Sequence, residues 1–118
     1  MYIVKKVRRA LTGMAAVFAS ESSMQIELVV SLAVIALAWW LGASRFELVF
    51  VVAAVSAVMV LEGLNTVLER VIDLAEPRYR DAVREIKDAL AGLVLLAACA
   101  ALAVVLIILW PYAAARFW

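Results

Sequence analysis

The chain has no histidine, one cysteine, two prolines and four glycines among its 118 residues. Without histidine there is no imidazole base and no His-rich metal site, so acid–base or metal chemistry must use carboxylates, lysine, tyrosine or asparagine. Cys99 has no second thiol to form a disulfide with, and we expect it to pack within its apolar run. Neither glycine-rich phosphate motif, G-x-x-x-x-G-K-[ST] or G-x-G-x-x-G, occurs, so any use of ATP requires a fold other than that of the soluble kinases.

Charge is also missing from three long stretches of the chain. These uncharged stretches are residues 28–44, 48–61 and 89–115. Because 69% of the residues are hydrophobic, a soluble domain of this size could not bury them, and lipid must serve as part of the solvent. With its flanks, each stretch reaches the length of about 20 residues that a spanning helix needs. We predict a single-domain, all-α integral membrane protein whose three transmembrane spans lie in helices at about residues 25–43, 46–75 and 82–112.

The first 20 residues differ from these stretches, because basic side chains interrupt the apolar ones. Apolar residues follow the 3,4 spacing of an amphipathic helix at positions 4, 7, 11, 14 and 18. The segment 1–20 is too polar to cross a bilayer and is predicted to lie along its surface. A cleaved signal peptide is the alternative, but the small-residue stretch is followed by Glu21 without a cleavage pattern.

The basic residues predict the orientation. Of the eleven, four lie in the first ten residues and five between residues 70 and 87, which leaves Arg45 and Arg116 on the other side. The positive-inside rule then places the N-terminus and the 70–87 segment in the cytoplasm and the C-terminus outside. Within that cytoplasmic segment, Pro77 disfavours a helical conformation for the residue before it, so the second long helix should end near residue 76.

A polar stripe follows the second uncharged stretch, in the pattern E-x-x-N-T-x-x-E-x-x-x-D. At about 100° per residue, Asn65, Glu69 and Asp73 lie roughly −60°, −20° and +20° from Glu62, on one helix face. Ionisable groups at the edge of the hydrocarbon are costly unless they pair or take part in chemistry. Their mutual repulsion is relieved either by a divalent cation such as magnesium, which prefers oxygen ligands, or by cationic side chains of neighbouring helices.

Residues on either side of the stripe supply partners. A hairpin between the second and third long helices would place Lys87 and Asp88 opposite Glu69, where the lysine either neutralises carboxylates or holds a phosphate. Glu21 and Glu27 flank the start of the first span, and each alone is more typical of a solvated helix end. Residue chemistry therefore predicts a magnesium-dependent or phosphate-handling site at the inner membrane surface.

The motif at residues 62–73, followed by Lys-Asp-Ala at 87–89, resembles that of the bacterial integral-membrane diacylglycerol kinases, a family that includes the undecaprenol kinases. Residues 13–27 are similar to the N-terminal motif of that family, and the resemblance extends from about residue 9 to 109. It implies a homotrimer in the bacterial inner membrane that transfers the γ-phosphate of MgATP to a lipid hydroxyl. The expected partners are ATP, a membrane lipid alcohol, the bilayer and further copies of this chain, with no nucleic acid.

The resemblance also implies a role for each matching residue. Glu62 would be the general base, Asn65 would orient the cluster, and Lys87 would neutralise charge on the transferring phosphoryl group. Glu21 and Glu69 would be the ligands of Mg²⁺ beside the ATP phosphates. Further expected contacts are Arg80, Asp88 and Arg9 with the nucleotide, and Glu27, Glu62 and Ala91 with the lipid; Asp88 would alternatively hold Lys87.

Several alternatives stay open. The residue pattern of the stripe is similar to that of the undecaprenol-kinase branch, whose product is undecaprenyl phosphate. A short three-span chain equally suits diacylglycerol as the substrate, with phosphatidic acid as the product. A non-enzymatic structural or regulatory membrane protein would use the same carboxylates only for pairing. A small ion or proton carrier would need carboxylates deep in the bilayer, and the uncharged stretches 28–44 and 89–115 contain none.

Overall fold

The computed structural model describes residues 1–118 and consists of helices without any strand. The four helices are α1 (Tyr2–Ser20), α2 (Ser22–Trp40), α3 (Arg45–Ala75) and α4 (Asp81–Phe117). By length and composition, the last three helices are able to cross a membrane. The prediction of an all-α chain with three spanning helices is therefore confirmed.

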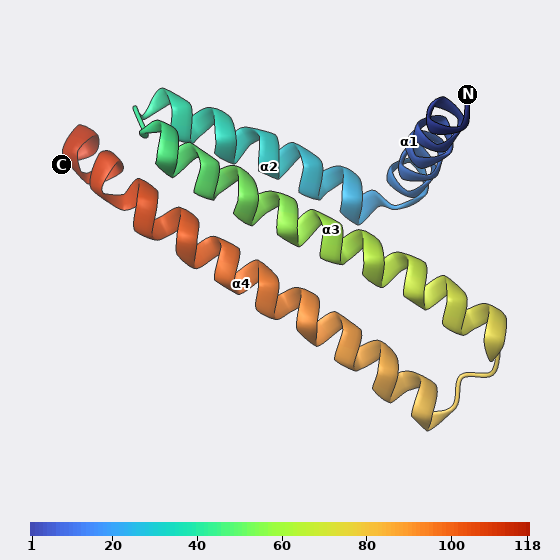
Figure 1. The fold of residues 1–118 in the computed structure, drawn as a ribbon. Helices are drawn as coiled ribbons and strands as arrows, with labels where there is room; N and C mark the ends of the chain where they lie inside the picture. The colour runs from blue at the N-terminus through green and yellow to red at the C-terminus, as the bar shows by residue number, and fades with distance from the viewer.

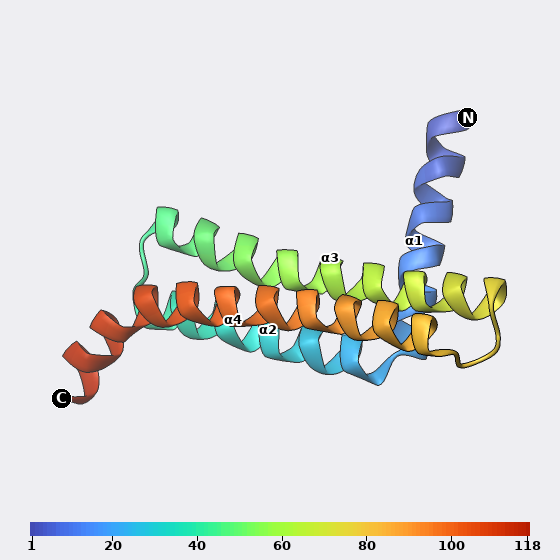
Figure 2. The same cartoon turned by 90° about the horizontal axis from the view of Figure 1, so that it is seen from below.

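The spanning helices lie side by side, and each runs antiparallel to the one before it (Figure 1). α3 has 31 residues and α4 has 37, whereas α2 has 19, so α3 and α4 continue as a pair beyond the start of α2 (Figure 1). α1 leaves the start of α2 at a steep angle to the bundle (Figure 2). This arrangement leaves the loop end of α3 and α4, with most of the polar stripe, outside the three-helix part of the bundle.

The turn between α2 and α3 is built from local hydrogen bonds. Gly42 has a φ of 91°, a left-handed conformation that favours glycine. Ser44 and Glu47 form a capping box, in which the Ser44 hydroxyl accepts from the Glu47 amide at 3.2 Å and the Glu47 carboxylate accepts from the Ser44 amide at 2.9 Å. The Tyr112 hydroxyl of α4 also donates to the Glu47 carboxylate. One carboxylate thus joins the start of α3 to α4.

Replacing Tyr112 by phenylalanine should lower the unfolding midpoint in detergent micelles by a few degrees, because the Glu47 carboxylate loses a charge-assisted hydrogen bond. Thermal unfolding followed by circular dichroism measures the shift. Tyr2→Phe is the matched control, since Tyr2 is 78% exposed and makes no side-chain hydrogen bond. Equal midpoints for the two variants would show that the Tyr112 contact does not stabilise the bundle.

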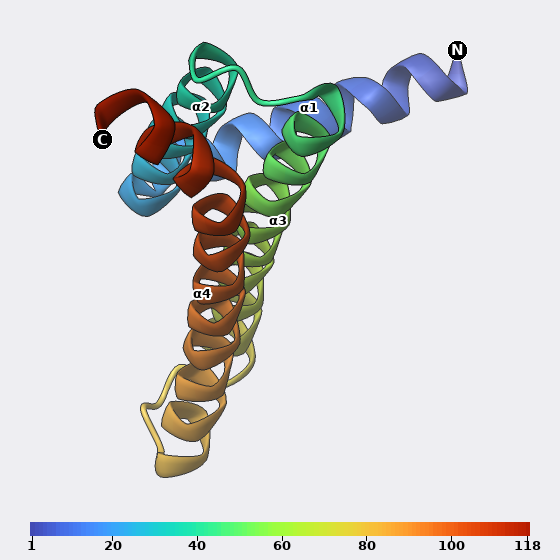
Figure 3. The same cartoon turned by 90° about the vertical axis from the view of Figure 1, so that its left-hand side faces the viewer.

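Pro111 lies inside α4, which continues to Phe117 and so passes the end expected at residue 112. A proline removes one backbone donor and crowds the preceding turn, which bends a helix when tertiary contacts keep it going. The last turns of α4 bend away from the helix axis in Figure 2 and lie beside the end of α2 in Figure 3. There the Arg116 guanidinium lies 4.1 Å from the centre of the Trp40 ring, a cation–π contact.

Few side chains are fully buried in the single chain. The buried cluster consists of Ala38, Val51 and Leu109, one residue from each spanning helix, near the end of the bundle that carries the α2–α3 turn. Most other apolar side chains of these helices are exposed. Such exposure is expected where lipid or another copy of the chain covers the helices.

Candidate active site

The polar stripe predicted from the sequence is present on α3. Glu62, Asn65 and Glu69 are half-buried, and Asp73 is exposed. The Asn65 amide nitrogen donates to the Glu69 carboxylate at 3.4 Å, the contact expected of a residue that orients Glu69. The carbonyl oxygen of the same Asn65 is buried and has no hydrogen-bond partner. A buried acceptor of this kind is costly unless a donor or a cation reaches it.

Lys87 of α4 faces the stripe, but one turn away from the expected position. Its ammonium lies 2.6 Å from the Asp73 carboxylate, and the Glu69 carboxylate also attracts it electrostatically. Helical side chains lean toward the N-terminus of their own helix, and this direction carries Lys87 toward the loop and hence toward Asp73. Asp88 is exposed and makes no hydrogen bond or ion pair. Asp73, rather than Asp88, therefore holds the lysine.

Glu21 is the one residue between α1 and α2, and its backbone is extended. Its carboxylate lies 3.0 Å from the Arg70 guanidinium of α3. The same guanidinium nitrogen donates to the Ser20 hydroxyl at 2.6 Å. The residue that the family resemblance makes a metal ligand is thus paired with an arginine, and this pair ties the α1–α2 junction to α3.

Glu27 of α2 is half-buried between the spanning helices. It is the charged residue in an apolar cleft of about 210 Å³ between α2, α3 and α4. Glu27 lies close enough to Glu62 for the two carboxylates to repel each other. The structure therefore brings together the two glutamates that were expected to contact the lipid.

The remaining predicted contacts lie at the edges of the site. Arg80 precedes α4 and pairs with Glu76 at 3.7 Å. Ala91 is exposed on α4, one turn beyond Lys87 on the same face. Arg9 is exposed on α1 without a hydrogen bond or an ion pair, so the single chain does not bring it to the stripe.

The oxygen donors near the stripe suit a hard cation, although a single chain does not bring them together around one point. No group of three or more His, Cys, Asp or Glu residues is placed to hold a metal ion. Glu21, Glu69 and the free carbonyl oxygen of Asn65 are oxygen donors of the type that Mg²⁺ prefers. Their chemistry fits magnesium, provided that Glu21 leaves Arg70 when the ion binds.

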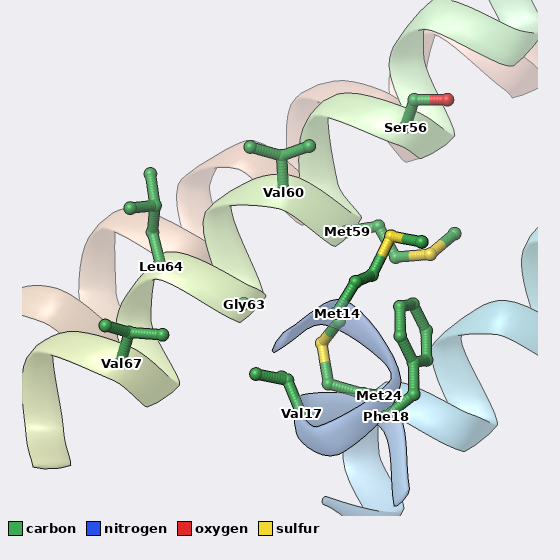
Figure 4. Close-up of a pocket in the computed structure, with 10 residues that line it drawn as sticks. All are labelled: Met14, Val17, Phe18, Met24, Ser56, Met59, Val60, Gly63, Leu64 and Val67. Atoms are coloured by element: carbon green, nitrogen blue, oxygen red, sulfur yellow. The ribbon is translucent and has the colours of Figure 1, made fainter. Parts of the chain in front are cut away.

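An apolar groove of about 320 Å³ opens between α1, the start of α2 and α3. Figure 4 shows methionines of three helices around it, with Gly63 on the α3 side. Its lining residues are Met14, Val17, Phe18, Met24, Ser56, Met59, Val60, Gly63, Leu64 and Val67. Glu62 does not line this groove, because successive residues of a helix point about 100° apart and the groove lies on another face of α3 than the stripe. No sequence pattern predicted this groove, since it depends on how α1 is placed against α3.

A model of the prokaryotic diacylglycerol kinase family matches residues 8–109. The chain belongs to this family. Among diacylglycerol kinases, it is 28% identical to that of Escherichia coli K12 over 110 residues, which cover 93% of this chain and 90% of the relative. It is 26% identical to the Haemophilus influenzae enzyme over 98 residues, 83% of each chain. It is 37% identical to the Synechocystis enzyme over 98 residues, 82% of this chain and 56% of the relative.

Two contacts of this family member were not predicted from its sequence. Arg70 was counted among the basic residues that predict the orientation, but its pairing with Glu21 was not expected. Asp73 was predicted to lie on the stripe, but without Lys87 as its partner. The partners lie 49 and 14 residues away in the chain, and one sequence carries no periodic signal over such separations.

Proposed function

We propose that this protein is an ATP-dependent lipid kinase, which transfers the γ-phosphate of MgATP to the hydroxyl group of a membrane lipid. The observation that carries the proposal is the stripe on α3, whose innermost carboxylate, Glu62, lies near Glu27 of the apolar cleft between α2, α3 and α4, while Lys87 lies at the outer end of the stripe. One reactant is apolar and the other is water-soluble. A site that runs from this apolar cleft to an exposed loop end suits such a pair.

In the proposed reaction, the lipid hydroxyl oxygen attacks the γ-phosphorus and the bond from that phosphorus to the bridging oxygen of ADP breaks. The hydroxyl proton passes to Glu62, the general base. Lys87 neutralises charge on the phosphoryl group in transit. Phosphoryl transfer depends mainly on positioning and charge neutralisation, which a fixed stripe of polar side chains can supply.

Magnesium bound with ATP would neutralise phosphate charge, and Glu21 and Glu69 are the residues proposed to hold it. The Asn65 amide, which donates to Glu69 at 3.4 Å, would keep that carboxylate in place. Arg80 and Asp88 flank the loop end where the nucleotide would enter. Arg9 is proposed as a nucleotide contact that a second copy of the chain would bring into place.

The apolar cleft that Glu27 lines, close to Glu62, is proposed to hold the hydrocarbon of the acceptor, with Glu27 and Ala91 near its headgroup. Diacylglycerol is the first candidate acceptor, because the relatives are named diacylglycerol kinases. Undecaprenol is the second, because the stripe is similar to that branch of the family. We further propose a homotrimer in the bacterial inner membrane with a cytoplasmic N-terminus, in which neighbouring copies cover the exposed apolar faces of the spanning helices.

A two-lipid assay tests this function. Purified protein in mixed micelles should transfer radiolabelled γ-phosphate from ATP to diacylglycerol, and chelation of Mg²⁺ should abolish the transfer. Transfer to undecaprenol alone would select the second acceptor. Transfer to neither lipid, by a folded protein, would reject the kinase proposal in favour of a membrane protein whose carboxylates only pair.

A further inference from the structure

Arg70 occupies a position that the proposed reaction does not yet use. It follows Glu69 in the chain and contacts Glu21 in space, so it adjoins both residues proposed to hold magnesium. We propose that Arg70 binds the phosphate groups of ATP. This inference rests on the proposed function, because it requires that MgATP bind at Glu21 and Glu69.

The guanidinium has donors to spare. An arginine carries five N–H donors, and both contacts of Arg70, to Ser20 and to Glu21, use the same nitrogen, Nη2. Its Nε and Nη1 make no hydrogen bond, and 47% of the side chain is exposed. Three N–H groups are therefore free for a ligand, while the Ser20 hydroxyl fixes the direction of the guanidinium plane.

Of the other cations near the stripe, Lys87 is more fully engaged than Arg70, and Arg80 has no contact with Glu21 or Glu69. The Lys87 ammonium lies 2.6 Å from Asp73, and its side chain is 23% exposed, half the value for Arg70. Arg80 pairs with Glu76 through its Nε. Among these three cations, Arg70 is the one placed beside a proposed metal ligand with donors free.

Charge balance explains how Arg70 would change partner. In the free chain, the positive guanidinium and the negative carboxylate of Glu21 neutralise each other at 3.0 Å. When Glu21 turns to a cation that arrives with ATP, that cation neutralises the carboxylate. The positive charge of the Arg70 guanidinium is then no longer paired. The phosphates are then the nearest anions, and a planar guanidinium binds two phosphate oxygens at once.

Nucleotide binding tests the proposal without relying on turnover. Binding of a non-hydrolysable ATP analogue, with Mg²⁺, is titrated by calorimetry in micelles for the wild type, Arg70→Ala and Arg70→Gln. We expect both variants to raise Kd by about tenfold, since each removes a charge-assisted contact. The KM for ATP should rise in parallel while the KM for lipid stays at its wild-type value. Arg70→Gln keeps a donor for Ser20 and serves if the alanine variant does not fold.

Two variants control for a purely structural role. Arg84→Ala removes another exposed arginine, paired with Asp81 at 3.5 Å, and should bind the analogue like the wild type. Ser20→Ala removes one of the two contacts between Arg70 and the junction but leaves the guanidinium and Glu21, and it should weaken binding much less than Arg70→Ala. Equal weakening by Ser20→Ala and Arg70→Ala would overturn the proposal in favour of a junction anchor.

The proposal and the proposed function fail in different ways. A wild type that phosphorylates lipid, with Arg70 variants that bind the analogue as tightly as Arg84→Ala, would overturn the role of Arg70 and leave the kinase function standing. A folded wild type that neither binds the analogue nor phosphorylates lipid would overturn both.

Discussion

Glu62→Gln is expected to reduce phosphate transfer to lipid by about 10²- to 10⁴-fold, the usual contribution of a general base. Glutamine keeps the size and the hydrogen-bonding atoms of the side chain but cannot accept the hydroxyl proton. The side chain is half-buried near Glu27 of the apolar cleft, so the variant also removes one of two repelling carboxylates and should fold at least as well as the wild type. Labelled ATP and extracted lipid product provide the measurement.

The matched control is Glu85→Gln, an exposed glutamate of α4 that makes no ion pair. It should retain wild-type turnover. Oligomer size in micelles and helix content are recorded for both variants, so that loss of activity can be separated from loss of the assembly. Wild-type turnover by Glu62→Gln would remove Glu62 from the role of general base.

Lys87→Met should cost about 10²- to 10³-fold in kcat, which is typical when one preorganised donor to developing charge is lost. Methionine keeps much of the length and apolar volume of the side chain but cannot offset charge on the phosphoryl group. Asp73→Asn should have a smaller effect, because the lysine stays charged and loses only the 2.6 Å partner that fixes its direction.

Lys6→Met is the control for the lysine variant, since Lys6 is an exposed residue of α1 without an ion pair. A loss in Asp73→Asn as large as that in Lys87→Met would show that the pair acts mainly to join α3 to α4. Retained activity in Lys87→Met would show that another cation neutralises the phosphoryl group.

The features that follow from local periodicity were predictable. The uncharged stretches located the spanning helices, and the 3.6-residue period of a helix correctly placed Glu62, Asn65 and Glu69 on one face of α3. Pro77 also marked the end of α3, whose last helical residue is Ala75. Each of these depends on residues close together in the chain, and a helix converts such spacing directly into geometry.

Features that depend on packing between elements were not predictable. The offset of Lys87 from Glu69 to Asp73 depends on the shape of the loop and the direction of a long side chain. The pair between Arg70 and Glu21 depends on where α1 meets α2. The third long helix was expected to end near residue 112, but α4 continues past Pro111 to Phe117, where Arg116 contacts Trp40 of α2.

The length of α3 has a consequence for how the protein would choose its acceptor. Its 31 residues extend about 46 Å, whereas the hydrocarbon core of a bilayer is about 30 Å thick. A spanning α3 would therefore hold its side chains at different depths, from the hydrocarbon to the water. Glu62 and Asp73 are about 16 Å apart along the axis of α3, a distance comparable to the thickness of a headgroup layer with the water next to it. If Glu62 is the general base, as proposed, an alcohol would react only when its hydroxyl group lies at the depth of Glu62 in the bilayer. The depth of the hydroxyl group would then select the acceptor before its shape does, and the thickness of the bilayer would affect which alcohols react.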